Sequence, residues 1–133
     1  TLVTYGSTWK IVAEAAKQLE DLGISAEVID VQTLVPLDIN KTMVNSVIKT
    51  NRLLVIDEDV PGGASSYILQ NIIEDQKGFF YLDSEPQTLA AKAHRPAYGK
   101  DGDYFSKPSV EDVVEKVYKM MNDVDPSKFP NLY

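Results

Sequence analysis

Along this chain, segments with the apolar spacing of helices alternate with short continuous apolar runs. Four segments repeat apolar residues at the three- and four-residue intervals that place them on one face of a helix. The expected inward faces are Val12, Ala15, Ala16, Leu19 and Leu22; Ile39, Met43, Val44, Val47 and Ile48; Ile68, Leu69, Ile72 and Ile73; and Val110, Val113, Val114, Val117 and Met121. Short apolar or β-branched runs between these segments predict strands. They cover residues 2–5, 26–31, 53–56 and 87–93, with a further short extended piece at 79–82.

Residues with capping side chains mark the starts of the predicted helices. Ser7 or Thr8 is expected to cap the first helix and Asp38 the second, because a side-chain oxygen can accept a bond from the free N–H groups there. Ser109, with Asp112 three residues later, resembles a capping box at the start of the last helix. These signals divide the chain into strands and helices that alternate.

Alternating strands and helices of this length predict a three-layer α/β/α open sheet of about five mostly parallel strands. The uninterrupted apolar run at 53–56 is typical of a strand buried on both faces, so the strand Arg52–Asp57 is expected at the centre. Residues 1–124 are expected to form one domain, and residues 125–133, which hold two prolines, an irregular tail. Because residues 2–5 already predict a strand, we expect a fragment of a longer chain.

Composition and charge exclude several classes of function. The 133 residues include no cysteine, which excludes a disulfide framework and Cys-based zinc or iron–sulfur sites. The formal net charge of −7 disfavours binding to nucleic acid or to anionic membranes. No apolar run approaches the roughly 18 residues of a membrane-spanning helix. A cytoplasmic protein is therefore expected.

Asp57, Glu58 and Asp59 follow the predicted central strand. Ligands of open α/β sheets favour this carboxyl edge, and clustered carboxylates can shift one another's pKa values for acid–base work. The competing and favoured interpretation is a solvated or partner-facing acidic edge. The sequence therefore predicts an acidic edge at these residues and no catalytic role for them.

Three further candidates for chemistry have simpler structural interpretations. The turn Pro61-Gly62-Gly63 precedes a helix but lacks the Lys and Ser or Thr of a phosphate-binding loop, so a tight turn is favoured. His94 is the only histidine, and a hydrogen-bonded loop residue is favoured over a base or metal ligand. Asp101-Gly102-Asp103, with Asn122 downstream, imitates a magnesium–diphosphate motif in the wrong order, which favours a solvated turn. No catalytic, cofactor-binding or metal-binding residue is therefore expected.

The long segment from His94 to Pro108 carries aromatic and basic residues together. Arg95, Tyr98, Tyr104 and Phe105 are of the types that anchor protein interfaces. A loop of this length is uncommon without a function. The sequence therefore favours a subunit or domain interface here, and the alternative is that the rings fold back on their own domain.

Several blocks, taken in order, resemble the transketolase carboxy-terminal domain family. They are Val3-Thr4-Tyr5-Gly6-Ser7; Glu27 to Val31 with Thr33-Leu34 and Pro36-Leu37-Asp38; Ser46 to Thr50 with Arg52 to Glu58; and Gly62-Gly63. The block Asp30 to Asp38 looks most like the beta portion of thiamine-dependent 2-oxoacid dehydrogenases acting on pyruvate or branched-chain 2-oxoisovalerate. Transketolase and deoxyxylulose-phosphate synthase are competitors. The long 94–108 segment and the 125–133 tail depart from a typical beta chain and resemble forms in which alpha and beta parts are fused.

The resemblance implies a parent oxidoreductase acting on 2-oxoacids with a lipoyl acceptor. In such a parent, earlier domains bind thiamine diphosphate and Mg²⁺, and this domain supports a homo-oligomer and helps to dock the dihydrolipoyl acyltransferase. The resemblance thus implies a non-catalytic assembly domain with no cofactor of its own, inactive in isolation. Its compartment would be the cytoplasm, or the mitochondrial matrix in a eukaryote. A self-contained small-molecule-binding α/β domain is the alternative.

Overall fold

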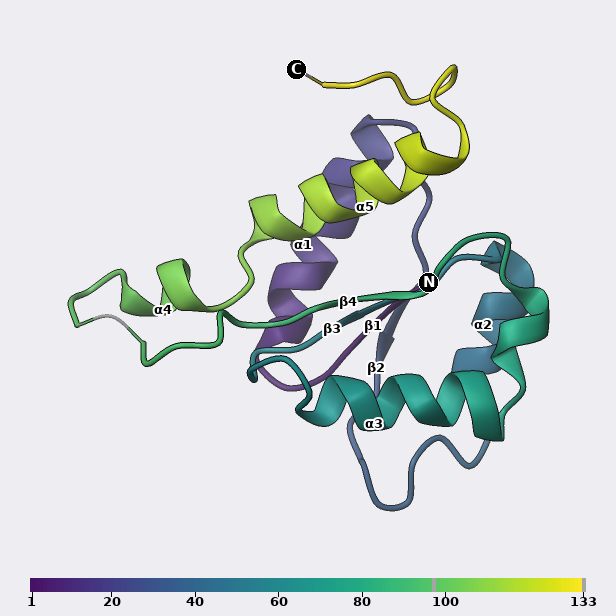
Figure 1. Cartoon of the computed structure of the whole chain (residues 1–133), viewed down its shortest axis with the longest axis horizontal. Coiled ribbons are helices and arrows are strands. Elements are labelled where there is room, and N and C mark those ends of the chain that lie inside the picture. Colours follow the sequence, from purple (N-terminus) through teal and green to yellow (C-terminus); the bar gives the residue numbers. More distant parts are fainter. Residues whose placement is uncertain (97, 133) are drawn as a thin grey trace.

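The computed structural model describes residues 1–96 and 98–132 and consists of alternating strands and helices (Figure 1). In chain order the elements are β1 (Leu2–Thr4), α1 (Thr8–Asp21), β2 (Val28–Asp30), α2 (Thr42–Thr50), β3 (Leu54–Ile56), α3 (Ala64–Gln70), the π-helix η1 (Asn71–Asp75), the 3₁₀ helix η2 (Gly78–Tyr81), β4 (Gln87–Leu89), α4 (Gly102–Ser106) and α5 (Val110–Val124). The α/β class predicted from the sequence is confirmed.

The described residues form one sheet of four parallel strands in the order β2-β1-β3-β4. β3 lies between β1 and β4, which confirms the central position expected for it. The expected count of about five strands is wrong by one. Residues 79–82 do not extend, because Lys77 has a left-handed φ of 62° and Gly78 starts a 3₁₀ turn. A Cβ at Gly78 would lie 2.7 Å from the carbonyl oxygen of Ile72, so the chain is packed tightly at this turn.

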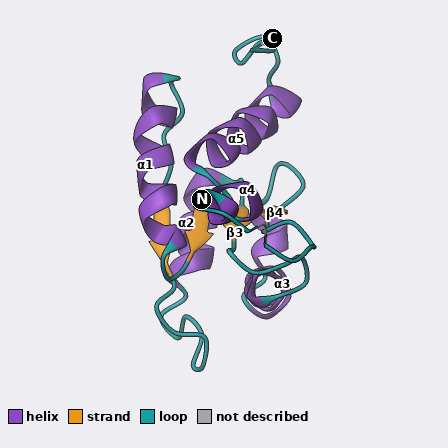
Figure 2. Cartoon of the chain, turned by 90° about the vertical axis from the view of Figure 1, so that its left-hand side faces the viewer, coloured by secondary structure: helices purple, strands orange, loops and turns teal. Residues whose placement is uncertain are grey.

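Helices cover both faces of the sheet (Figures 1 and 2). α1 and α5 pack side by side on one face, and α2 and α3 cover the other. Because strand side chains alternate, Leu2 faces α1 and α5 while Val3 faces α2 and α3. Two apolar cores result, and burying them is the main term that holds the three layers together.

The start of α2 differs from the expectation in its position but not in its chemistry. The helix begins at Thr42, and the carboxylate of Asp38 accepts bonds from the N–H groups of Thr42 and Met43 at 2.8 Å each. Ile39 lies before the helix and is 74% exposed, and Ile48 is 44% exposed, so both were wrongly placed on the inward face. The apolar spacing predicted a helix that begins too early, because it included Ile39, which lies in the short loop between Asp38 and the start of α2.

α3 continues without a break into the π-helix η1, which shifts the hydrogen-bond register. Gln76 follows this shift, and its side chain reaches across to α2. Its amide oxygen accepts from the N–H of Val44 at 3.3 Å, and its amide nitrogen donates to Asp38 at 3.0 Å. The end of η1 is therefore fastened to the start of α2.

The last helix and the residues after it form a further packed unit. Ser109 and Asp112 make the expected capping box at the start of α5. Residues 125–132 contain no helix or strand, yet Phe129 is only 4% exposed and meets the ring of Tyr118 edge-on. The Asn122 side chain donates to the carbonyl of Phe129 at 2.6 Å. Across the described residues, no helix is both long and apolar enough to span a membrane.

Candidate functional site

The carboxyl edge of the sheet brings β1 and β3 together at the point where the strand order reverses. β1 pairs with β2 on one side and with β3 on the other. The connection after β1 therefore runs to one side of the sheet, and the connection after β3 runs to the other side, to β4. Tyr5 follows β1 and Asp57 follows β3. Open α/β sheets favour ligands at such a switch point, and the acidic residues Asp57, Glu58 and Asp59 lie there.

Asp57 is completely buried and its carboxylate is fully engaged. One oxygen accepts from the Tyr5 hydroxyl at 2.6 Å and from the Asp59 N–H at 3.0 Å. The other accepts from the Ser65 N–H at 2.9 Å. These three bonds join the end of β1, the turn after β3 and the start of α3. Asp57 is thus a structural carboxylate, since a buried charge is tolerated when it is hydrogen-bonded on this scale.

The other two residues of the acidic edge have separate surroundings. Glu58 accepts from the Ser7 hydroxyl at 2.8 Å and from the Lys107 ammonium at 3.4 Å. Asp59 is exposed and accepts from the N–H of Val60 at 2.8 Å. Because each carboxylate has its own partners, the arrangement favours the structural interpretation of this edge over shared acid–base chemistry.

The glycine turn and the remaining candidates also have local explanations. A Cβ on Gly63 would lie 2.6 Å from the carboxylate of Asp59, so this glycine allows the turn to close over an acid that would repel an anion. The His94 ring shares a 2.8 Å hydrogen bond with the carbonyl of Arg95. Asp101 lies in an exposed turn, as expected, and the short helix α4 begins after it at Gly102, which is buried. Among the described residues, no three His, Asp or Glu side chains are grouped to hold a metal.

Tyr5 provides a pH-dependent test of this edge. Partial burial, followed by the hydrogen bond to Asp57 and nearby negative charge, raises the pKa of the Tyr5 phenol well above its ordinary value of 10. The unfolded chain releases this proton first, so the stabilisation is complete below pH 10 and is lost as the pH rises above it. We expect the free energy of unfolding to fall above pH 10 less steeply in Tyr5→Phe than in the unmodified chain. Urea titrations between pH 8 and 11 measure the difference, and parallel curves would contradict it.

The four predicted interface residues lie in one projecting segment, which we call the arm and define as residues 92–96 and 98–107. Tyr98, Tyr104 and Phe105 are 83%, 64% and 55% exposed, and the Arg95 guanidinium lies 4.9 Å from the centre of the Tyr98 ring. The Tyr104 hydroxyl reaches Glu111 of α5 at 3.3 Å. The rings are exposed and do not join the core, but whether they contact a partner stays a prediction.

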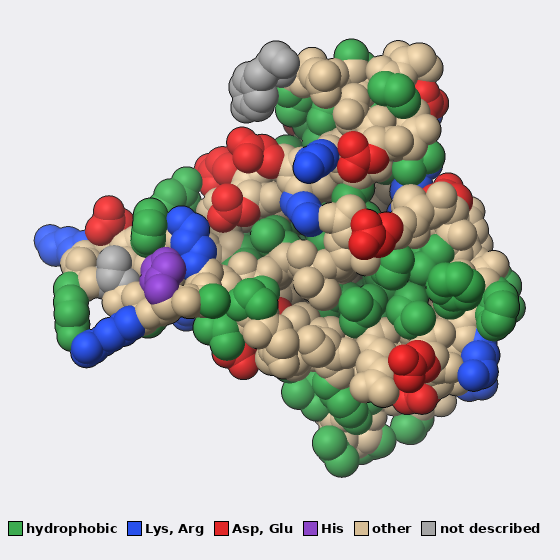
Figure 3. Space-filling view, in the orientation of Figure 1, with side chains coloured by type: hydrophobic (Ala, Val, Ile, Leu, Met, Phe, Trp, Pro, Cys, Tyr) green, Lys and Arg blue, Asp and Glu red, His purple; other side chains and the backbone are tan. Residues whose placement is uncertain are grey.

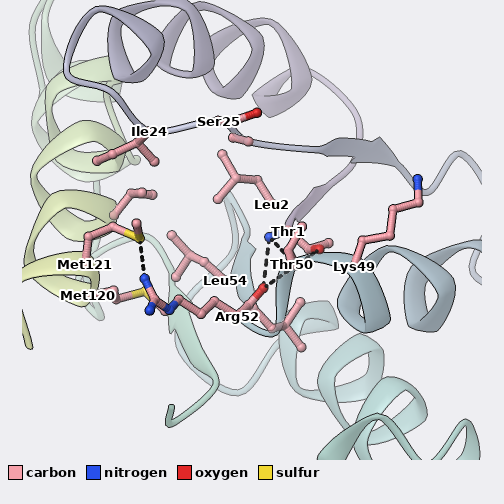
Figure 4. Close-up of a pocket in the computed structure, with 13 residues that line it drawn as sticks. Thr1, Leu2, Ile24, Ser25, Lys49, Thr50, Arg52, Leu54, Met120 and Met121 are labelled. Carbon is pink, nitrogen blue, oxygen red and sulfur yellow. Dashed lines mark hydrogen bonds between the residues drawn. The ribbon is translucent and has the colours of Figure 1, made fainter. Parts of the chain in front are cut away.

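A cavity lies at the opposite, amino edge of the sheet (Figure 4). It measures about 320 Å³, and its walls come from the starts of β1 and β3 and from α5. Its basic groups are engaged, because Lys49 pairs with Glu27 at 2.6 Å and Arg52 with Asp83 at 3.1 Å. This cavity offers little free charge to a ligand.

Sequence reasoning identified Asp57 but missed its partners. Tyr5 comes directly after a strand, and the carboxyl ends of parallel strands meet at one edge, so its proximity to Asp57 was available from topology. Ser65 contributes a backbone N–H, which carries no side-chain signal. Lys107 is 49 residues from Glu58 along the chain, and its contact depends on the path of the arm.

Comparison with known proteins gives a consistent result. The family model described as "Transketolase, C-terminal domain" matches residues 1–113. The pyruvate dehydrogenase E1 component subunit beta of Rhizobium meliloti (strain 1021) is 34% identical over 118 residues, covering 88% of this chain and 25% of the relative. The mitochondrial subunit beta-1 of the same component from Arabidopsis thaliana is 33% identical over 115 residues, covering 86% of this chain and 31% of the relative.

A solved structure supports the same fold. The protein described as "Split gene transketolase, inactive beta4 tetramer" superposes with a TM-score of 0.67 at 21% identity, covering 91% of this chain and 37% of that one. The chain therefore spans about a quarter to a third of the length of these relatives. With a family model that matches most of its residues and relatives that align along nearly all of it, this chain belongs to the transketolase C-terminal domain family.

Proposed function

We propose that this chain is the non-catalytic assembly domain of a thiamine diphosphate-dependent 2-oxoacid dehydrogenase component. The observation that carries the proposal is the carboxyl edge, where Asp57 is buried and bonded to three donors and Glu58 is bonded to Ser7 and Lys107. The edge that serves ligands in many α/β sheets is here used to hold strands and helices together. Its role is then to support assembly, while decarboxylation belongs to other parts of the parent.

The parent's chemistry follows from the relatives, two of which are described as beta subunits of the pyruvate dehydrogenase E1 component. In this proposal the parent oxidises a 2-oxoacid and passes the acyl group to a lipoyl acceptor, with thiamine diphosphate and Mg²⁺ bound outside residues 1–133. The partners of this domain are the other domains of the parent, a second copy of it and the dihydrolipoyl acyltransferase. Its compartment is the cytoplasm or, in a eukaryote, the mitochondrial matrix.

The exposed arm supports an assembly role for this chain. Arg95, Tyr98, Tyr104 and Phe105 lie together away from the core, and aromatic rings with an arginine are the usual anchors of interfaces. In this proposal the arm contacts another subunit or domain of the parent. The residues of the acidic edge have no catalytic part.

A small-molecule-binding role is the second candidate, and the cavity of about 320 Å³ favours it because its size falls within the range of ligand sites. Against it, the basic side chains of Lys49 and Arg52 are already paired, and the cavity lies at the sheet edge opposite the one that ligands favour. The assembly role is therefore the better supported of the two.

We expect isothermal titration of this chain with thiamine diphosphate and Mg²⁺ to give no binding heat, while titration with a dihydrolipoyl acyltransferase core does. The reason is that the acids nearest to a cofactor motif, Asp101 and Asp103, lie at the start of α4 with Gly102 buried between them. An intact E1 component from a relative serves as the positive control for the cofactor. Micromolar cofactor binding by this chain would refute the non-catalytic assignment. The absence of binding heat with the acyltransferase core would refute docking.

A further inference from the structure

The arm projects from the body of the molecule and carries unpaired positive charge (Figures 1 and 3). It holds four Lys and Arg residues against two Asp, in a chain whose formal net charge is −7. Lys107 pairs with Glu58 and Asp103. Lys92, Arg95 and Lys100 are exposed and form no ion pair with the residues that the structure describes.

The cations of the arm are placed on its aromatic rings. The Lys92 ammonium lies 3.6 Å from the centre of the Phe105 ring, and the Arg95 guanidinium 4.9 Å from that of Tyr98. The His94 ring lies 5.7 Å from Phe105. Rings and cations that contact each other hold one another in place, which lowers the side-chain entropy lost when a partner binds. The arm is thus a preorganised basic and aromatic surface.

The segment formed by η1, η2 and the residues that follow lies at the other end of the molecule's longest axis from the arm (Figure 1), and it carries exposed aromatic and acidic side chains. We call them the acidic aromatic patch, and they belong to Glu74, Asp75, Phe79, Phe80, Tyr81 and Glu85. Its three rings are consecutive on η2, and η2 packs against η1, which carries two of the acids. Its three acids form no ion pair with any described residue, and one basic residue, Lys77, lies among them.

We infer that the arm of one copy of this chain binds the acidic aromatic patch of a second copy. The inference rests on the proposed assembly role and names the partner of the arm. Because arm and patch lie at opposite ends, two copies that run antiparallel place each arm on the other's patch. The resulting two-fold dimer is closed and contains the same contact twice. Carboxylates of the patch then neutralise the arm's cations, and the six rings leave water together.

The available surface is sufficient for a stable pair. Aromatic side chains bury about 150–250 Å² each, so the exposed parts of Tyr98, Tyr104 and Phe105 offer about 400 Å², and the three rings of the patch about 350 Å². Two such contacts could remove at most roughly 1,500 Å² from water, with every exposed part of these rings covered, which is near the size of a standard specific interface. One contact alone would be about half of that, so closure of the dimer matters to its stability.

Charge reversal tests the pairing directly. The arm variant is Lys92→Glu with Arg95→Glu, and the patch variant is Glu74→Lys with Glu85→Lys. A matched control, Lys10→Glu with Lys119→Glu, makes the same charge change as the arm variant on exposed residues of α1 and α5. We expect the dimer dissociation constant, from sedimentation equilibrium, to rise at least about tenfold in each test variant, because attractive pairs become repulsive in both contacts. The control should leave it within about threefold.

Mixing provides the decisive measurement. An arm variant and a patch variant together restore opposite charges in both contacts, so the equimolar mixture should dimerise more tightly than either variant alone. A chain that is monomeric at every concentration, variants that dimerise as tightly as the unmodified chain, or a mixture that stays monomeric would overturn the inference. A monomeric chain would also remove the second copy from the proposed partners, whereas the acyltransferase and cofactor titrations test docking and the non-catalytic assignment independently of this contact.

Discussion

Val55→Asp is expected to abolish folding. Val55 is completely buried in β3, with β1 on one side and β4 on the other, and it packs in the core beneath α2 and α3. An uncompensated carboxylate there costs several kcal/mol, on the order of the 5–15 kcal/mol that stabilise a whole domain. Circular dichroism of the purified variant should show no cooperative thermal transition at neutral pH.

A matched substitution separates burial from the change of residue type. Val35→Asp introduces the same side chain at a position that is 87% exposed in the loop before α2, and its melting temperature should match that of the unmodified chain. If Val55→Asp also melted normally, β3 would not be the buried centre of the sheet. The comparison therefore tests the placement of the strand and not the general tolerance of the chain for added charge.

Asp57→Ala should cost about 3–5 kcal/mol of folding free energy, because it leaves the buried N–H of Ser65 and the partly buried hydroxyl of Tyr5 without their acceptor and removes charge-assisted bonds. Urea denaturation at pH 7 measures the loss. Asp59→Ala is the control, since Asp59 is exposed and its removal should cost about 1 kcal/mol or less. Equal losses in the two variants would contradict the structural role assigned to Asp57.

The order of strands and helices could be predicted from the sequence because its signals are local. The run at 53–56 is apolar at every position, which indicated a strand buried on both faces, and β3 is central. The prediction for 79–82 failed because apolar composition alone does not distinguish buried from exposed rings: Phe79 and Phe80 are 62% and 76% exposed. What places them outward is the tight turn at Gly78, which depends on contact with Ile72.

Less of the candidate site could be predicted. The position of Asp57 at the end of a buried strand was evident, but its burial and bonding depend on Tyr5 and Ser65, which come from two other elements. The length of the arm was visible, whereas its cation–ring contacts required coordinates. Chemistry that arises within one segment could be anticipated, and chemistry assembled across segments could not.

The π-helix η1 has a consequence for the changes of length that this domain can accept. Its wider turn moves every later residue of that helix by one position relative to α3, which is how Gln76 comes to face Asp38 and Val44. Removing a single residue within 71–75 would turn this wide turn into an ordinary α-helical one, and Gln76 would then keep nearly the same direction, because the wider turn absorbs the roughly 100° that one residue adds. Homologous chains that lack this extra residue would therefore keep the same fastening of α2, whereas removing a residue from the α-helical part of α3 would turn Gln76 away by roughly 100°.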